Sequence, residues 1–110
     1  MKKVLTIATV FAFGVLASAR AADVKENWEK QCAKCHGPDG KADTKMGKKL
    51  EVRDLTDPKI QAAFTDAQAT TAIKDGVKVE DKSKMPGYAD KLNDEEIKAL
   101  VAYVRSLKKG

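Results

Sequence analysis

Apolar residues recur along this chain at the three- and four-residue intervals of amphipathic helices, with polar and turn-forming segments between them. The clearest such stripe lies near the C-terminus and consists of Ile97, Leu100, Val101, Val104 and Leu107. Asn93 can cap the start of this helix, and Lys108 and Lys109 complement the negative end of its dipole. We expect the stripe to pack against the core.

Another helix is expected at the other end of the chain. It begins near Val24 and continues through Trp28 into the segment 31–32, because these positions also follow helical spacing. Trp28 is the only tryptophan of the chain. Its simplest role is that of a core residue packed against the last helix or a bound group.

Capping signals predict two shorter helices in the middle of the chain. Asp57, which a proline follows, can start a helix that runs through Ala63. Thr65 and Gln68 have the spacing of a capping box, in which each side chain bonds to the backbone of the other residue. The helix that follows them should end at Gly76.

The remaining stretches are expected to be irregular. Segment 37–40 is a dense turn signal, and the lysine-rich stretch 41–50 should wrap as a loop. A second loop is expected over 77–89, with Met85 and Pro86 in it. No segment has the convincing features of a strand, so the predicted fold class is all-α.

The N-terminus has the pattern of a cleavable secretory signal. It combines a basic start, an apolar run over 4–16 and small residues around a cleavage site at 19–21. We expect residues 1–21 to be removed after Ala21, leaving 22–110 as a single small domain. An uncleaved membrane anchor is the alternative, although the apolar run is short for a bilayer.

Charge gives no support for nucleic-acid binding. The whole chain has 21 basic and 16 acidic side chains, a formal net charge of +5. The expected signal contains three basic and no acidic residues, so the remaining domain has 18 basic and 16 acidic side chains, a balance of only +2. A basic stripe of the kind that binds phosphates is not indicated.

Both cysteines and the only histidine lie in the segment Cys32-Ala33-Lys34-Cys35-His36, the pattern of a c-type haem attachment site. Two thiols at this spacing can each add to one vinyl group of a haem, which forms two thioethers. His36 would then supply one ring nitrogen as an axial ligand of the iron. Its other ring nitrogen would donate to a carbonyl, for which Pro38 is a candidate.

Three other interpretations compete with haem attachment. A zinc site needs about four separated ligands, whereas Cys35 and His36 are adjacent and the chain has no further Cys or His. A thioredoxin-like redox pair would be expected beside a strand-helix-strand pattern. A structural disulfide between Cys32 and Cys35 is possible in an oxidising compartment, but it would close too short a loop to constrain the unfolded chain much.

A haem would also complete a small core. The aromatic residues of the expected domain are Trp28, Phe64, Tyr88 and Tyr103. A domain of this size is near the lower limit of what an unaided hydrophobic core can stabilise. We therefore expect the haem-free chain to be largely unfolded or molten.

The motifs together resemble those of small bacterial monohaem class I cytochromes c. The matching features are a first helix that ends in Cys32-Ala33-Lys34-Cys35-His36-Gly37, the pair Met85-Pro86, and a last helix containing Leu100-Val101-Ala102-Tyr103-Val104. The resemblance covers the whole expected domain. It implies four or five short helices around one covalently bound haem c, with the first and last helices crossing.

One departure concerns that crossing. Members of the family often have a glycine or small residue early in the first helix, which allows close contact with an aromatic residue of the last. This chain has no glycine between Ala22 and His36. Without that glycine, the close packing of Trp28 against Tyr103 does not follow from the resemblance.

The resemblance also implies a second axial ligand. Members of the family use a methionine sulfur, and Met85 corresponds to it by its position before Pro86 and shortly before the last helix. Met46 is the rival, although it follows His36 closely in the chain. The expected site is therefore Cys32, Cys35, His36 and Met85, with His36 and Met85 on the iron.

The expected function is that of a monomeric, one-electron carrier that is not an enzyme. Ligation by His and Met leaves no open position on the iron for a substrate. A gas-binding haem protein and an electron-donor subunit of a haem enzyme complex are the alternatives. Independent peroxidase catalysis lacks a second histidine for acid-base work.

The expected partners are redox proteins, including membrane-bound ones, rather than nucleic acids or small substrates. Several lysines could ring the haem edge and steer the protein to acidic partners: Lys34, Lys41, Lys45, Lys48, Lys49, Lys82 and Lys84. An ordinary solvated surface explains the same lysines equally well. The signal and the covalent haem together predict export to a bacterial periplasm.

Overall fold

The computed structural model describes residues 23–109, and the expected signal peptide lies outside this range. The described part begins with a helical stretch over 23–36. Its middle is a π-helical turn, η1 (Trp28–Cys32), in which the Ala33 N–H reaches the carbonyl of Trp28, and it ends in α2 (Ala33–His36). The first helix is thus confirmed, although its π-helical turn was not predicted.

A short helix, α3 (Lys45–Lys49), occupies part of the lysine-rich stretch, so the prediction of a loop there was wrong. Thr44 caps this helix, since its hydroxyl accepts from the Gly47 N–H at 2.8 Å. The same hydroxyl donates to the carbonyl of Cys35 at 2.9 Å. The helix is therefore fixed by contacts with the cysteine segment, which apolar periodicity cannot reveal.

The two helices predicted from capping signals are confirmed as α4 (Pro58–Ala62) and α5 (Asp66–Asp75). Asp57 accepts from the Lys59 N–H at 2.9 Å. Thr65 and Gln68 form the complete capping box, with both side-chain-to-backbone hydrogen bonds present. Gly76 ends α5 with a φ of 80°.

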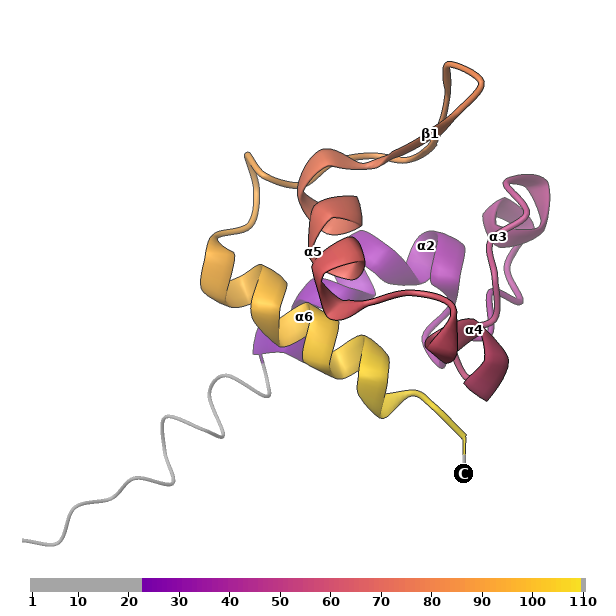
Figure 1. Ribbon diagram of the computed structural model, residues 1–110, viewed down its shortest axis with the longest axis horizontal. Helices are drawn as coiled ribbons and strands as arrows, with labels where there is room; N and C mark the ends of the chain where they lie inside the picture. Colours follow the sequence, from indigo (N-terminus) through magenta and orange to yellow (C-terminus); the bar gives the residue numbers. More distant parts are fainter. Residues whose placement is uncertain (1–22, 110) are drawn as a thin grey trace, which may run out of the picture.

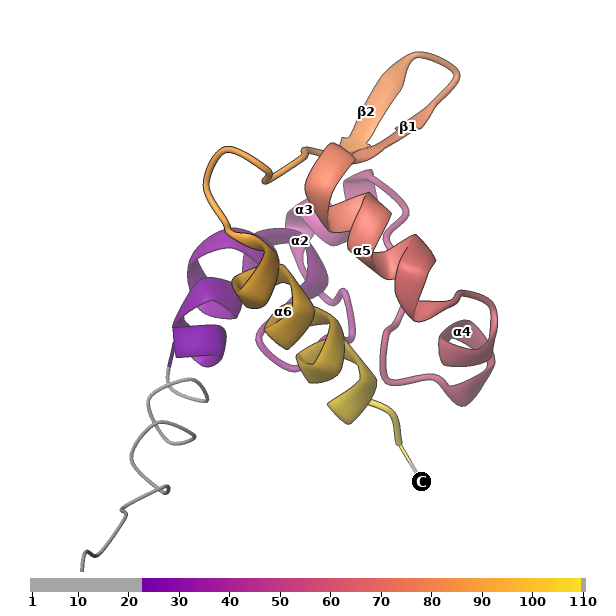
Figure 2. The same cartoon turned by 60° about the vertical axis from the view of Figure 1, so that its left-hand side comes forward.

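The second expected loop contains an antiparallel hairpin of β1 (Val77–Val79) and β2 (Lys82–Met85), so the absence of strands was a wrong prediction. Its turn consists of Glu80 and Asp81, both with positive φ, at 52° and 65°. This turn geometry normally favours glycine or asparagine, and the chain has neither at these two positions, so no hairpin signal is present in the sequence. In Figures 1 and 2 the hairpin projects away from the helices.

The last helix, α6 (Asp94–Ser106), carries all but the last residue of the predicted apolar stripe on its buried face; Leu107 is its C-cap and is partly buried. Asn93 and Glu96 form its capping box. Ile97 and Leu100 are each 1% exposed, and Trp28 of the first helix is 2% exposed. Figure 2 shows α6 beside α5 and the first helix, so these elements enclose one core. The arrangement confirms a mostly helical fold with one added hairpin.

The first and last helices meet through an aromatic contact. The ring centroids of Trp28 and Tyr103 lie 5.2 Å apart, with the planes tilted by 45°. Aromatic pairs favour such tilted arrangements at this separation. The contact forms although no glycine occurs in the first helix.

No helix within 23–109 is both long enough and apolar enough to cross a membrane.

Arg105 of α6 holds the turn between α4 and α5. Its guanidinium donates to the carbonyls of Gln61 and Phe64, and stacks over the Phe64 ring at 4.4 Å. It also pairs with Asp66 at 2.7 Å, but the Asp66 side chain is 71% exposed. The contacts with the backbone should therefore stabilise the fold more than the ion pair does.

Arg105→Ala should lower the free energy of unfolding by about 1–3 kcal/mol, because it leaves carbonyl acceptors without their donor. Arg105→Lys should restore little, since an ammonium cannot reproduce the forked set of bonds. Asp66→Asn, as a control, should cost less than about 1 kcal/mol. Denaturant unfolding of the three variants measures this, and equal losses for Arg105→Ala and Asp66→Asn would contradict it.

Candidate functional site

Two adjoining cavities lie between the cysteine segment, the hairpin and α5. The first has a volume of about 660 Å³ and the second about 420 Å³. Cys32, His36 and Met85 line both cavities. The space is of the size that buries a cofactor, and these three side chains lie where its two halves meet.

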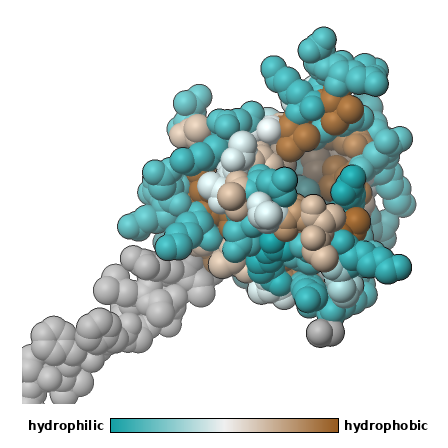
Figure 3. Space-filling view, in the orientation of Figure 1, coloured by the Kyte–Doolittle hydropathy of each residue, from teal (hydrophilic) through white to brown (hydrophobic). Residues whose placement is uncertain are grey.

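The two cavities differ in their walls. The second is bounded mainly by apolar side chains, among them Leu55, Phe64, Ile73 and Leu100. The first is lined by charged side chains as well, including Arg53, Lys82 and Lys84. Apolar surface gathers beside the projecting hairpin in Figure 3. The site thus suits a large, mostly apolar group with a charged edge.

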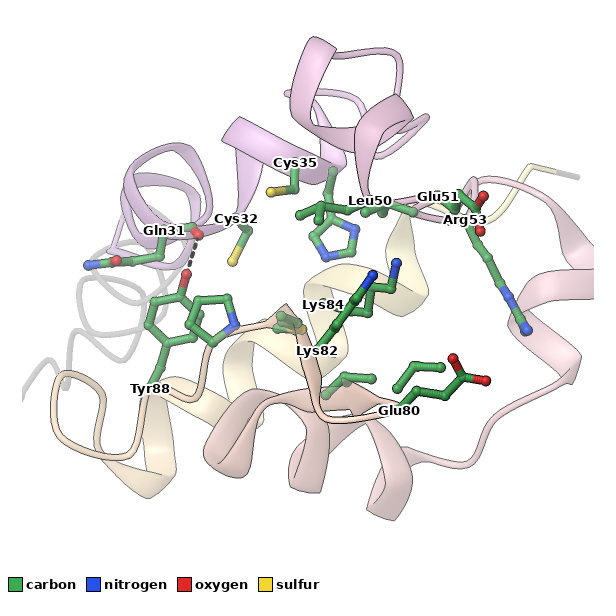
Figure 4. A pocket seen from close by; sticks show the side chains of 16 residues that line it. Gln31, Cys32, Cys35, Leu50, Glu51, Arg53, Glu80, Lys82, Lys84 and Tyr88 are labelled. Carbon is green, nitrogen blue, oxygen red and sulfur yellow. Dashed lines mark hydrogen bonds between the residues drawn. The ribbon is translucent and has the colours of Figure 1, made fainter.

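Cys32 and Cys35 extend from the first helical stretch toward the first cavity (Figure 4). Cys32 is 7% exposed and Cys35 is half-buried, and both are free thiols in this structure. Burial, with a smaller effect of Cys35, raises the pKa of the Cys32 thiol to about 11. A redox-active C-x-x-C pair has a lowered thiol pKa instead, so the raised pKa of Cys32 does not favour the thioredoxin-like interpretation.

His36 is the last residue of α2 and follows the second cysteine directly. Its side chain forms part of the wall of both cavities. Burial lowers the pKa of His36, which favours the neutral imidazole, the form that binds metals. The expected hydrogen bond to the Pro38 carbonyl is absent at Nδ1, which is buried without a hydrogen-bond partner. Burial thus keeps the imidazole neutral, and a neutral imidazole can bind a metal through one ring nitrogen, as an axial ligand does.

Trp28 holds the backbone that follows His36. Its indole Nε1–H donates to the Gly37 carbonyl at 3.0 Å, and its ring centroid lies 5.6 Å from that of His36. This hydrogen bond fixes the backbone directly after His36. The core role predicted for Trp28 is confirmed, and the same side chain borders the second cavity.

The two methionines considered as ligands occupy different places. Met85 ends β2 and lines both cavities with His36. Met46 lies on α3 and lines neither cavity. The structure thus brings together all four residues expected at the site, although Met85 is far from the others in sequence.

Tyr88 is a residue of the site to which the sequence analysis gave no role. Its hydroxyl donates to the Gln31 carbonyl at 2.8 Å, next to Cys32, and its side chain lines the first cavity. Burial raises the pKa of Tyr88, so its hydroxyl keeps the proton that it donates. Its position shortly after Met85-Pro86 is the only signal in the sequence that could have suggested this contact.

The zinc alternative gains nothing from the geometry. Across the described range 23–109, no three His, Cys, Asp or Glu side chains form a group that could hold a metal ion. A single histidine with an apolar cavity is a different arrangement, suited to a metal that arrives inside a larger organic group.

Comparison with known proteins agrees with this chemistry. The family model described as cytochrome C oxidase, cbb3-type, subunit III matches residues 19–104. The chain belongs to this family of c-type cytochromes. Membership, with the two cysteines of the C-x-x-C-H motif, implies electron transfer through covalent haem c and not enzymatic catalysis.

Two relatives illustrate the likeness of this cytochrome to known members. Cytochrome c-553 of Helicobacter pylori (strain ATCC 700392 / 26695) is 37% identical over 112 residues, which cover 98% of this chain and 100% of that protein. The structure of KustC0563 c-type cytochrome is 34% identical, with a TM-score of 0.68 over 77% of this chain and 96% of its own. A mutant of that protein matches with a TM-score of 0.67, over 78% and 99%.

The residues of this cytochrome fit haem c. The cavities meet at Cys32, His36 and Met85, and burial keeps the His36 imidazole in the neutral form that binds iron. Cys32 and Cys35 would hold the macrocycle through thioethers, and the apolar wall of the second cavity would cover it. This fit explains how so small a domain obtains a core of sufficient size.

Cys32→Ala/Cys35→Ala should leave the chain largely unfolded or molten, because the apolar walls of the cavities then face water. Near-UV circular dichroism reports this, since the fixed packing of Trp28 and Tyr103 should disappear. The unsubstituted chain without attached haem should behave in the same way, which separates loss of the haem from loss of the thiols. A native-like near-UV spectrum in both proteins would refute the prediction.

Proposed function

We propose that this cytochrome is a diffusible one-electron carrier in which His36 and Met85 are the two axial ligands. The observation that carries the proposal is that these two side chains, distant in sequence, line both cavities together with Cys32. Bound haem c supplies the redox chemistry, because its iron gains or loses one electron. A His/Met pair leaves no position open for a substrate.

The surroundings of the site are proposed to favour the reduced state. His36 and Met85 are neutral ligands, and the second cavity is lined by apolar side chains such as Leu55, Phe64 and Leu100. A medium of low polarity disfavours the extra positive charge of ferric iron relative to ferrous iron. Both effects raise the reduction potential, as expected for a carrier with this ligand set.

Met85→Ala should remove the weak far-red methionine-to-iron charge-transfer band from the ferric spectrum. It should also let carbon monoxide bind the ferrous protein readily, because a ligand position becomes open. Met46→Ala is the matched control and should leave both properties unchanged. Visible spectra of the three haem-loaded proteins decide between the methionines.

Two other results would change the assignment of the ligand or of the function. Loss of the band in Met46→Ala would transfer the ligand role to Met46. A high-spin ferric spectrum and ready carbon monoxide binding in the unsubstituted protein would mean an open iron, and would overturn the carrier proposal in favour of gas binding.

Redox proteins are the proposed partners, and the cavity mouth is the proposed docking region. Lys82 and Lys84 line the first cavity and enter it from the side opposite Cys32 and Cys35 (Figure 4). The other lysines considered in the sequence line neither cavity, and Lys48 pairs with Asp43 at 3.2 Å. The proposed contribution to steering is therefore narrowed to Lys82 and Lys84.

Lys82→Gln/Lys84→Gln should slow association with an acidic redox partner by roughly tenfold at low salt and should flatten its dependence on ionic strength. Lys59→Gln/Lys108→Gln is a control with the same charge change at positions that line neither cavity. Stopped-flow electron transfer at several salt concentrations measures both rates. An equal effect of the two double substitutions on the association rate would mean that Lys82 and Lys84 act only as ordinary surface charges and do not steer the partner to the cavity mouth.

A second candidate function follows from the matched family, whose description names a subunit of cytochrome c oxidase. In that role this cytochrome would donate electrons within a larger complex, and the same ligands would serve. Co-purification with an oxidase would favour this candidate, whereas isolation as a free monomer would favour the diffusible carrier. For either role we propose a periplasmic location, on the basis of the signal pattern in 1–21.

A further inference from the structure

The segment that carries Met85 is packed against the C-terminal end of α5 through backbone atoms. Val77, the first residue of β1, pairs with Met85, the last residue of β2. Gly76 precedes this pair and Gly87 follows it two residues after Met85. We propose that Gly76 and Gly87 are positioning residues that set the place of Met85 relative to α5. The inference rests on the proposed ligand role of Met85.

Gly76 makes the closer of the two backbone approaches. A Cβ atom at this position would lie 2.5 Å from the carbonyl oxygen of Met85, 2.8 Å from the nitrogen of Gly87 and 3.0 Å from the carbonyl carbon of Pro86. All three are backbone atoms, which no change of rotamer can move aside. Gly76 also has φ of 80° and ψ of −178°, a region that is essentially restricted to glycine.

Gly87 makes the reciprocal contact. A Cβ atom there would lie 2.7 Å from the carbonyl oxygen of Lys74 and 2.8 Å from the carbonyl carbon of Asp75. Hydrogen bonds hold the same approach, since the Tyr88 N–H donates to the Ile73 carbonyl at 2.8 Å and the Ala89 N–H to the Lys74 carbonyl at 3.3 Å. The two segments thus touch backbone to backbone at Met85 and along the residues that follow it, as far as Ala89.

Tyr88 extends this attachment to the first helical stretch, beside Cys32. Its hydroxyl donates to the carbonyl of Gln31, the residue before Cys32. The Met85 segment is therefore fixed to α5 by the two glycines and to the first helical stretch by Tyr88. Met85 pairs with Val77 at the base of the hairpin, at the opposite end from the turn of Glu80 and Asp81.

A side chain on Gly76 should displace the ligand by a distance that matters. Ordinary contact begins at 3.4 Å, whereas the Cβ would lie 2.5 Å from the Met85 oxygen. The segment must therefore retreat by close to an ångström, or α5 must shift. Ligand sites lose function through errors of this size, and a shifted Met85 should leave the iron more often.

Imidazole binding to the haem-loaded ferric protein measures how often Met85 leaves. An external ligand binds the open state, so its apparent affinity rises with the population of that state. Gly76→Ala should bind imidazole roughly tenfold more tightly than the unsubstituted protein, or more tightly still. Its far-red charge-transfer band should weaken or shift.

Gly40→Ala is the matched control. Gly40 has nearly the same φ, 79°, so alanine strains the backbone there as well. The three atoms nearest to its Cβ would all belong to the side chain of Leu107, the first at 2.6 Å, and not to the Met85 segment. Both variants should lose stability to denaturant, but only Gly76→Ala should gain affinity for imidazole.

Gly87→Ala gives a second test if Gly76→Ala does not take up haem, because it disturbs the same contact from the segment that carries Met85. The positioning role would be overturned if every haem-loaded variant of Gly76 or Gly87 bound imidazole with unchanged affinity. An equal gain in affinity in Gly40→Ala would overturn it too. Met85→Ala separates this result from failure of the proposed function. If Met85→Ala keeps the band, the ligand assignment itself is wrong; if it loses the band while the glycine variants behave like the unsubstituted protein, only the positioning role fails.

Discussion

The contacts of the Trp28 indole connect the parts on which the rest of this cytochrome depends. Its ring packs on Tyr103 of α6 and faces His36, and its N–H holds the carbonyl of Gly37. One side chain, 2% exposed, thus joins the first helix, the last helix and the backbone beside an expected ligand. Because it borders the second cavity too, the core and the cofactor site are one continuous structure.

Local signals were sufficient to predict most of the helices. The caps at Asp57, Thr65 and Asn93 depend on hydrogen bonds within a few residues, so their spacing in the chain reveals them. The hairpin and α3 could not be predicted in this way. The turn at Glu80 and Asp81 has residue types unusual for its φ values, and α3 depends on the contact of Thr44 with the distant Cys35 carbonyl.

The same distinction applies to the site. Cys32, Cys35 and His36 were predictable because covalent attachment and axial ligation need them at a fixed spacing. Met85 could be inferred only from family resemblance, and the structure adds that it shares both cavities with His36. Tyr88 and Gly76 have roles that depend on which backbone atoms approach them across the fold, and no pattern along the chain records that approach.

The π-helical turn that precedes the second cysteine has a consequence for the evolution of this domain. A helix advances by about 100° per residue, so one residue more or fewer before Cys32 would rotate everything upstream by that angle relative to the cysteines. The wide turn at Trp28–Cys32 accommodates an extra residue while both its ends stay buried. The alignment of core and cofactor therefore depends on the number of residues in this turn, so lineages should tolerate exchanges of Glu29 or Lys30 more readily than insertions or deletions beside them.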